Sequence, residues 1–184
     1  MTESRPGMVS AENYKDNKTE VFARFYEEYL PKVLRYISYR VGDMYLAEDL
    51  TSVVFEKALT RLDSYRSEGA FASWLFSIVR NTVTDHFRVK AKRQTIPIEE
   101  VSEVRSQDDP PEEEAIRQED LQRLHEYLSQ LSQREQEVIS LKYGAELTNR
   151  EIAKTLGLSE SNVGVILYRT LARLRQRFKD WQDG

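Results

Sequence analysis

The stretch NREIAKTLGLSESNVGVILY (residues 149–168) predicts two short helices joined by a tight turn. Ala153 is small enough for the point where two helices touch, Gly157 can adopt the positive φ of the turn, and Val163 can lock the second helix onto the first. Ser159 suits the N-cap of the second helix. The remaining packing residues are Ile152, Leu156, Leu158 and Ile166. Because several independent positions agree, the pattern favours a helix-turn-helix over a plain helical hairpin.

The second of these helices has the residues needed to read duplex DNA. In a helix-turn-helix, its N-terminal residues enter the major groove. Asn162 can pair with adenine, and Val165 can contact a thymine methyl group. Arg169 and Arg173 can hold phosphates. Three basic side chains follow later in the helix: Arg175, Arg177 and Lys179. They can also hold phosphates, or they can form a solvated basic end that suits the helix dipole.

Charge is unevenly distributed along the chain, whose total is −4. Residues 20–93 and 121–184 each carry a net charge of +2, whereas residues 94–120 carry −8. Local charge, rather than the total, governs electrostatic binding. The sequence has no apolar run of membrane-spanning length and no cysteine, so we expect no membrane insertion, disulfide or thiolate zinc site. The first twenty residues lack the apolar core of a secretory signal, so we expect a cytoplasmic protein.

Hydrophobic periodicity predicts an all-α protein of two small helical domains joined by a flexible acidic linker. Residues 1–18 are polar and aperiodic and are expected to form a disordered tail. Residues 19–93 form the first domain, of three to four helices. Residues 94–118 form the linker, within which Glu112, Glu113 and Glu114 suit the first turn of a new helix. Residues 119–180 form the second domain.

Local signals set the expected helix ends. The first helix starts near Thr19, is kinked or split at Pro31, and ends at Gly42. A second helix follows over residues 43–62, and a loop over residues 63–71 leads into a third. In the second domain, two capping boxes mark helix starts; they are Ser132-x-x-Glu135 and Thr148-x-x-Glu151.

The third helix, SWLFSIVRNTVTDHFRVKAKR (residues 73–93), begins apolar and ends as a basic arm. Arg80, Thr84 and Arg88 are four residues apart and are expected on one outward face, beside Asn81. Aromatic surface nearby comes from Trp74, Phe76 and Phe87, while the inward residues are Leu75, Ile78, Val79, Thr82 and His86. Bases interleaved with aromatic rings suit single-stranded DNA. The alternative is a buried aromatic helix with a solvated basic end.

Residues 20–93 and 121–178 together resemble the extracytoplasmic-function (ECF) group of bacterial RNA polymerase sigma factors. YLAEDLTSVVFEKAL (residues 45–59) is similar to the family's polymerase-binding helix, and FASWLFSIVRNTVTDHFR (residues 71–88) is similar to its helix that melts and reads the −10 element. Residues 131–175 are similar to its −35-reading domain. Three motifs in this order, separated by a linker, are highly specific.

The resemblance implies a role for each matching residue. The expected contacts with the clamp coiled coil of the polymerase β′ subunit are Glu48, Asp49, Leu50, Val54 and Phe55. The loop from Ser64 to Phe71 would hold a base flipped out of the −10 element. The expected −10 contacts are Ser64, Arg66, Phe71, Trp74, Arg80, Asn81, Asp85, Arg88, Lys92 and Arg93. Asp85 can equally be an internal salt-bridge or capping residue. The expected −35 contacts are Thr148, Ser159, Glu160, Ser161, Asn162, Val165, Arg169 and Arg173.

The family also implies partners: core RNA polymerase, through the β′ clamp coiled coil and the β flap, promoter DNA, and an anti-sigma factor. This sequence departs from the family at Ser52 and Val53, where Gln-Glu is common. It departs again at Gly164 and the two residues after it, where Lys-Ser-Arg or similar residues are common. Ile166 is expected to pack inward, so −35 readout would rest on Asn162, methyl contacts and DNA shape.

Catalysis has little support in the sequence. His86 and His125 are the only histidines and fall in different domains, so both are expected to be structural. No nucleophile or metal motif is present, and we expect no catalytic residue, metal or cofactor. Two other function classes are a free-standing helix-turn-helix regulator with an N-terminal dimerisation or sensing domain, and a nucleic-acid-modifying enzyme. A sensing domain would have no reason to expose both a docking helix and a basic arm.

The acidic linker yields a testable prediction. Its carboxylates can mask the basic arm and the recognition helix in the free chain. We expect that replacing Glu99, Glu100, Glu103, Asp108 and Asp109 with Gln or Asn raises the affinity of the free chain for DNA at low salt. The gain should shrink as ionic strength rises, because exposed charges are screened. Fluorescence anisotropy with a duplex probe measures both effects. Tight, sequence-specific binding by the unmodified free chain would instead favour the free-standing regulator.

Overall fold

The computed structural model describes residues 18–65, 71–94 and 112–182. These residues form helices and short turns, and no strand occurs among them, which confirms the predicted all-α class. The helices are α2 (Lys18–Val41), α3 (Met44–Arg61), η1 (Leu62–Ser64), α4 (Phe71–Gln94), α5 (Glu112–Ser129), α6 (Gln133–Ile139), η2 (Ser140–Gly144), α7 (Asn149–Leu156) and α8 (Glu160–Gln182). The predicted tail lies outside the described residues, except for its last residue. Most of the predicted linker does too, although its last seven residues fall in α5.

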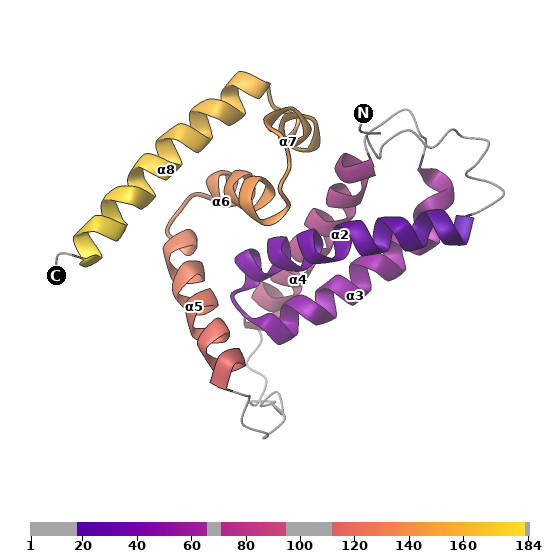
Figure 1. Cartoon of the computed structure of the whole chain (residues 1–184), viewed down its shortest axis with the longest axis horizontal. Coiled ribbons are helices and arrows are strands. Elements are labelled where there is room, and N and C mark those ends of the chain that lie inside the picture. Colours follow the sequence, from indigo (N-terminus) through magenta and orange to yellow (C-terminus); the bar gives the residue numbers. More distant parts are fainter. Residues whose placement is uncertain (1–17, 66–70, 95–111, 183–184) are drawn as a thin grey trace, which may run out of the picture.

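Helices α2, α3 and α4 pack together as the N-terminal part of the fold (Figure 1). Their apolar faces bury Ile37, Val54 and Val79 completely. Helix α3 starts where expected, because the Asp43 side chain accepts a hydrogen bond from the backbone N–H of Leu46 at 3.1 Å. Helix α2 continues through Pro31 to Val41, so the helix is not split there.

Helices α5 to α8 form the C-terminal part. Both predicted capping boxes are confirmed, at the starts of α6 and α7. Helices α7 and α8 form the predicted helix-turn-helix, with Ile152 and Val163 fully buried between them. The turn depends on Gly157, which has a φ of 65° and is the C-cap of α7. Residues with a Cβ adopt this left-handed conformation only at a cost.

The two parts share one hydrophobic core. Tyr36 of α2 is 1% exposed and packs edge-on against the Phe76 ring of α4, and the same buried cluster continues into Leu141 and Ala145. Figure 1 shows α6 and α7 lying between α8 and the α2–α4 group. The backbone of Gly144 touches α2 so closely that an added Cβ would lie 2.9 Å from Cα of Tyr36. The sequence predicted two domains on a tether, but it did not predict this packed interface.

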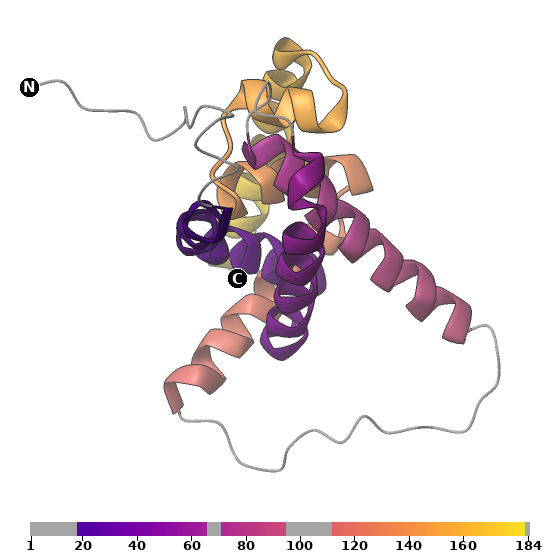
Figure 2. The same cartoon turned by 90° about the vertical axis from the view of Figure 1, so that its right-hand side faces the viewer.

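Two helices extend beyond this packed centre. Figure 2 shows the C-terminal half of α4 projecting away from the other helices, and Figure 1 shows the same for most of α8. From Thr84 onward, the side chains of α4 with assigned burial are exposed except for His86, which is half-buried. The basic arm and the recognition helix therefore both have open surface.

Two glycines of the helix-turn-helix provide a matched stability test. An added Cβ would meet no atom within 4 Å at either Gly157 or Gly164, but only Gly157 has a positive φ. We expect Gly157→Ala to lower the free energy of unfolding by about 1–2 kcal/mol, through left-handed strain. Gly164→Ala should raise it by about 0.5–1 kcal/mol, because alanine loses less backbone entropy in a helix. Urea denaturation of both variants measures the difference, and equal effects would contradict the assigned backbone conformation.

Candidate nucleic-acid interface

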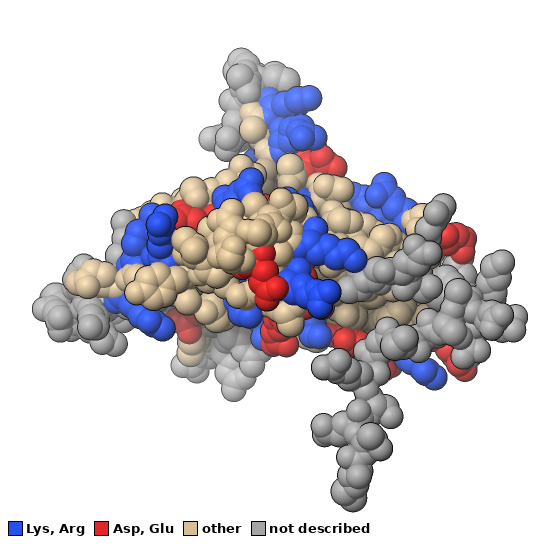
Figure 3. Space-filling model, turned by 90° about the horizontal axis from the view of Figure 1, so that it is seen from above, with Lys and Arg blue, Asp and Glu red and all other residues tan. Residues whose placement is uncertain are grey.

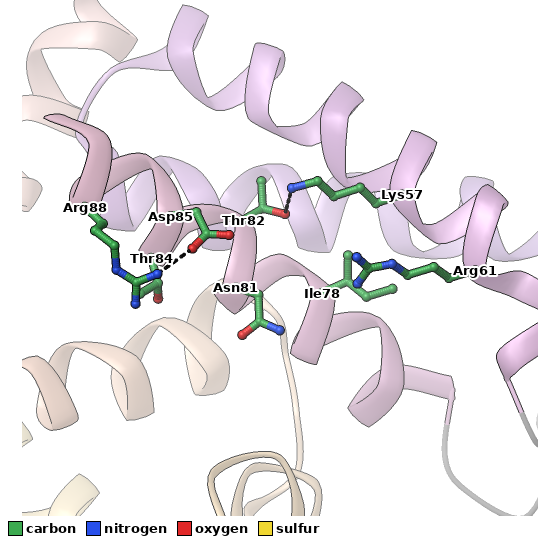
Figure 4. A pocket seen from close by; sticks show the side chains of 8 residues that line it. All are labelled: Lys57, Arg61, Ile78, Asn81, Thr82, Thr84, Asp85 and Arg88. Carbon is green, nitrogen blue, oxygen red and sulfur yellow. Dashed lines mark hydrogen bonds and ion pairs between the residues drawn. The ribbon is translucent and has the colours of Figure 1, made fainter.

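A groove of about 250 Å³ lies between α3 and α4 (Figure 4). We call it the α3–α4 groove. Its lining residues are Lys57, Arg61, Ile78, Asn81, Thr82, Thr84, Asp85 and Arg88. Lys57 and Arg61 come from α3, and Figure 4 shows both side chains directed toward α4. The arrangement brings together bases that are more than twenty residues apart in the sequence.

The α3–α4 groove is suited to a polyanion. Three of its side chains are cationic, and Asp85 is its only carboxylate. The Nζ of Lys57 donates to Oγ1 of Thr82 at 3.1 Å, and Arg88 pairs with Asp85 at 3.0 Å. The Arg88 and Asp85 side chains are 65% and 59% exposed, so a phosphate can replace this carboxylate at little cost. Asn81 and Thr84 add uncharged hydrogen-bonding groups.

Arg80 does not share this open surface, so the expectation of one outward face with Thr84 and Arg88 was wrong. Its Nε donates to Oε1 of Glu137 at 2.8 Å, one terminal nitrogen reaches Oε2 at 3.3 Å, and the other donates to the backbone carbonyl of Thr155 at 3.1 Å. Both acceptors lie in the C-terminal part. In this structure Arg80 therefore joins the two parts of the fold.

The aromatic residues near α4 are mostly structural. Phe71 is 7% exposed and stacks on Phe25 with ring centroids 3.7 Å apart. Trp74 is half-buried beside Phe71. Phe76 is completely buried, so its expected role as aromatic surface was wrong, whereas Phe87 is 37% exposed. Of these four α4 rings, only those of Trp74 and Phe87 are not buried.

The remaining −10 candidates are scattered. The Ser64 hydroxyl donates to the carbonyl of Arg61 at 2.5 Å. Lys92 is exposed on the projecting end of α4. Arg66 lies outside the described residues, and so does the side chain of Arg93. The bases on the described surface form several separate groups in the view of Figure 3, rather than one stripe.

Only some of the residues of α3 that the sequence predicts as polymerase contacts are exposed. Glu48 and Asp49 are exposed, as a docking surface requires. Leu50, Val54 and Phe55 are 9%, 0% and 5% exposed, so they hold α3 in the core rather than reach a partner. The sequence interpretation did not select five other exposed residues of α3, which are Tyr45, Ser52, Val53, Glu56 and Leu59.

Helix α8 presents the expected recognition residues. Glu160, Ser161 and Asn162 are exposed in its first turn, and Ser159 accepts from the backbone N–H of Asn162 at 3.2 Å as the N-cap. Val165 is 46% exposed and Arg169 is exposed, whereas Ile166 packs inward as expected. The Thr148 side chain is held in its capping box by Glu151. The sequence interpretation missed Tyr168, which is 80% exposed.

Both histidines have structural neighbours. The His86 ring contacts Phe87, and Nδ1 of His125 lies 3.4 Å from the carbonyl of Tyr39. Within the part of the chain that the structure describes, no group of His, Cys, Asp and Glu is arranged to hold a metal ion. None of the described helices is long and apolar enough to cross a membrane.

Comparison with known proteins places these surfaces in two regions of one protein family. Residues 25–93 match the family model Sigma-70 region 2, and residues 121–174 match Sigma-70, region 4. The ECF RNA polymerase sigma factor SigD of Mycobacterium tuberculosis is 31% identical over 79% of this chain and 71% of its own length. The chain belongs to the ECF sigma factors. The ECF sigma factor BldN of Streptomyces coelicolor is 33% identical over 91% of this chain, which spans 65% of BldN. YlaC of Bacillus subtilis is 29% identical over 89% and 92% of the two chains.

Solved structures agree with this sigma-factor fold. CnrH, in a complex with the cytosolic domain of CnrY, superposes with a TM-score of 0.68 at 20% identity, over 92% of this chain and 95% of its own. RpoE of Bartonella quintana, in a complex with the anti-sigma factor NepR, superposes with a TM-score of 0.66 at 22% identity, over 88% and 98% of the two chains. The likeness extends over both regions.

In this ECF sigma factor, the region 2 match covers most of α2 to α4, and the region 4 match runs from Leu121 to Leu174. The α3–α4 groove is thus a region 2 feature, and most of α8 lies within the region 4 match. Lys57 and Arg61 were missed by the sequence interpretation. Their spacing of four residues on one helix was the available signal.

Arg173 has an acidic partner within region 4. Its guanidinium pairs with the carboxylate of Glu135, which also closes the capping box of α6. The hydrogen bond from Arg173, with those from Ser132, lowers the pKa of Glu135 to about 2. Arg173 is exposed, but it can hold a DNA phosphate only by leaving or sharing Glu135.

This pair predicts how region 4 responds to acid. A lowered pKa means that the Glu135 carboxylate stabilises the folded state fully above its ordinary pKa of 4.5, and loses that contribution as the pH falls toward 2. Glu135→Gln keeps a capping-box side chain but cannot titrate. We expect the free energy of unfolding of the variant to fall less than that of the parent across this pH range. Urea titrations at several pH values test this, and parallel pH profiles would contradict it.

Proposed function

We propose that this ECF sigma factor is the promoter-selecting subunit of RNA polymerase. It binds core polymerase, directs it to particular promoters, and helps to open the −10 region. One observation carries this proposal: a single chain combines a basic groove suited to single-stranded DNA in region 2 with an exposed recognition helix in region 4. A subunit that both melts and reads a promoter needs the two surfaces together.

In this proposal, the α3–α4 groove takes the displaced strand of the −10 element. Lys57, Arg61 and Arg88 hold its phosphates, and Asn81 and Thr84 supply hydrogen bonds near the bases. The half-buried ring of Trp74 and the region from Ser64 to Phe71 accept an unstacked base. Base extrusion costs a few kcal/mol, which contacts of this kind offset.

The −35 element is read by α8. Ser161 and Asn162 address base edges, Val165 contacts a methyl group, and Arg169 holds a phosphate. This surface has few charges, so direct readout is supplemented by DNA shape. Isolated binding is then weak, and core polymerase supplies the remaining affinity by fixing both regions on one promoter.

Core polymerase docks on the outer face of α3. Glu48 and Asp49 offer charge to the β′ clamp coiled coil, and the exposed Val53 and Leu59 offer apolar contact. Region 4 binds the β flap. Two similar structures are complexes, one with the cytosolic domain of CnrY and one with the anti-sigma factor NepR, which supports an anti-sigma partner here. The sigma factor acts in the cytoplasm and has no catalytic centre of its own.

The free-standing regulator remains the second reading from the sequence, but nothing observed favours it. It would leave the acidic face of α3 and the basic groove without a purpose, whereas both surfaces have a role in a polymerase subunit. Matches to region 2 and region 4 in their usual order also support the polymerase subunit.

Two variants separate the steps of this function. Asp49→Lys should weaken binding to purified core polymerase, because it reverses a charge on the docking face. The double variant Arg61→Gln, Arg88→Gln should bind core normally but form fewer open complexes, with the salt-dependence slope reduced by about one to two units. Arg24→Gln with Arg134→Gln, at exposed positions outside both surfaces, is the charge-matched control.

Size-exclusion chromatography with core polymerase and permanganate footprinting of a promoter selected by transcription in vitro give the two readouts. Circular dichroism establishes that each variant is folded. The proposal fails if the parent chain neither co-elutes with core polymerase nor supports promoter-specific transcription. An unchanged salt slope in the groove variant would remove Arg61 and Arg88 from the DNA contact.

A further inference from the structure

The Arg80 side chain of α4 makes hydrogen bonds across the interface between region 2 and region 4. Three of its hydrogen bonds cross that interface, two to the Glu137 carboxylate and one to the carbonyl of Thr155. The Arg80 and Glu137 side chains are only 28% and 14% exposed. Charge-assisted bonds that are shielded from water are stronger than surface ion pairs.

Other contacts close the same interface. Arg35 of α2 pairs with Glu146 at 2.8 Å, and Arg40, which is 7% exposed, donates to the side chain of Gln136 at 3.1 Å. Gly144 allows the two backbones to touch at Tyr36. Region 4 thus covers one side of α4 while the α3–α4 groove stays open on another.

The chemistry of the Arg80 contact matches that of a DNA contact. A guanidinium binds a carboxylate and a phosphate in the same forked geometry, through paired N–H groups. Glu137 therefore occupies the coordination that a backbone phosphate would need. A carboxylate and a phosphate cannot use the same two N–H groups at once.

We propose that Glu137 is an internal substitute for a DNA phosphate and holds the free sigma factor in a closed state that withholds Arg80 from the promoter. This inference rests on the proposed function, and it adds Arg80 to the −10 contacts of region 2, as the family resemblance implies. A DNA phosphate that takes the Arg80 guanidinium must break its contact with Glu137, so DNA favours the open state.

The competing explanation is a permanent interface, in which Arg80 serves only to join the two regions. The two explanations differ in what happens when the carboxylate is removed. A closed state in equilibrium with an open one shifts toward opening, and DNA affinity rises by the same factor by which the competent fraction rises. A permanent interface loses stability but gains no DNA affinity.

The test uses the full chain, which has no cysteine of its own. Ala23→Cys in α2 and Ala172→Cys in α8, both at exposed positions, carry spin labels that report the distance between the regions. Binding of a fluorescent single-stranded thymidine 20-mer at low salt reports access to the basic surface. Stacking and phosphate contacts make such a probe tolerant of sequence.

Glu137→Gln removes the competing charge with little change in shape. We expect a population with a longer distance, and affinity for the probe raised by about three- to tenfold. Gly144→Ala is an independent way to open the interface, because its Cβ would lie 2.9 Å from Cα of Tyr36. Glu126→Gln, at an exposed position in α5, makes the same charge change away from Arg80 and should leave the distance unchanged.

A further variant identifies the group that is released. If Glu137 masks Arg80, the gain from Glu137→Gln disappears when Arg80→Gln is also present. The proposal is overturned if the two regions separate without a gain in affinity, if neither the distance nor the affinity changes in Glu137→Gln, or if the gain survives without Arg80. Transcription by the parent chain with core polymerase tests the proposed function separately, so failure of the closed state leaves that function intact.

Discussion

The close contact between the backbones of Gly144 and Tyr36 brings region 4 against α2. A side chain at Gly144 would collide with α2, so only glycine lets the π-helical turn η2 approach this closely. The approach buries Tyr36 and continues the apolar core from region 2 into region 4. Burial raises the pKa of the Tyr36 hydroxyl, which therefore stays neutral beside Arg40, Arg80 and Glu137. A neutral phenol can be enclosed at such a junction without the cost of a buried charge.

In this arrangement the residues of α4 have three different surroundings. Apolar residues such as Val79 hold the helix in the core, Arg80 faces region 4, and Thr84 and Arg88 border the α3–α4 groove. The helical repeat makes the division possible, because residues a few positions apart point in different directions. Neighbouring residues of this one motif therefore make different contacts.

The fold could be predicted from sequence to a large extent, because its signals are local. The capping boxes, the Asp43 N-cap helix and the turn at Gly157 each depend on a few adjacent residues. The candidate sites were predicted less well because they depend on distant partners. Nothing near Arg80 in sequence indicates Glu137, fifty-seven positions away, and the apolar Phe55 fits a docking helix and a core equally well. Lys57 and Arg61 become part of a site only once α3 lies beside α4.

Helix α4 is uninterrupted from the core residue Phe71 to Gln94, and this continuity has a mechanical consequence. Arg80 and Arg88 are eight residues apart on one rod, which corresponds to about 12 Å along its axis. A continuous helix resists bending, so a displacement of its projecting end also moves its packed half. The packed half of α4 includes Arg80, which contacts Glu137 of region 4. A displacement at the tip therefore reaches the contact between the two regions with no loop in between.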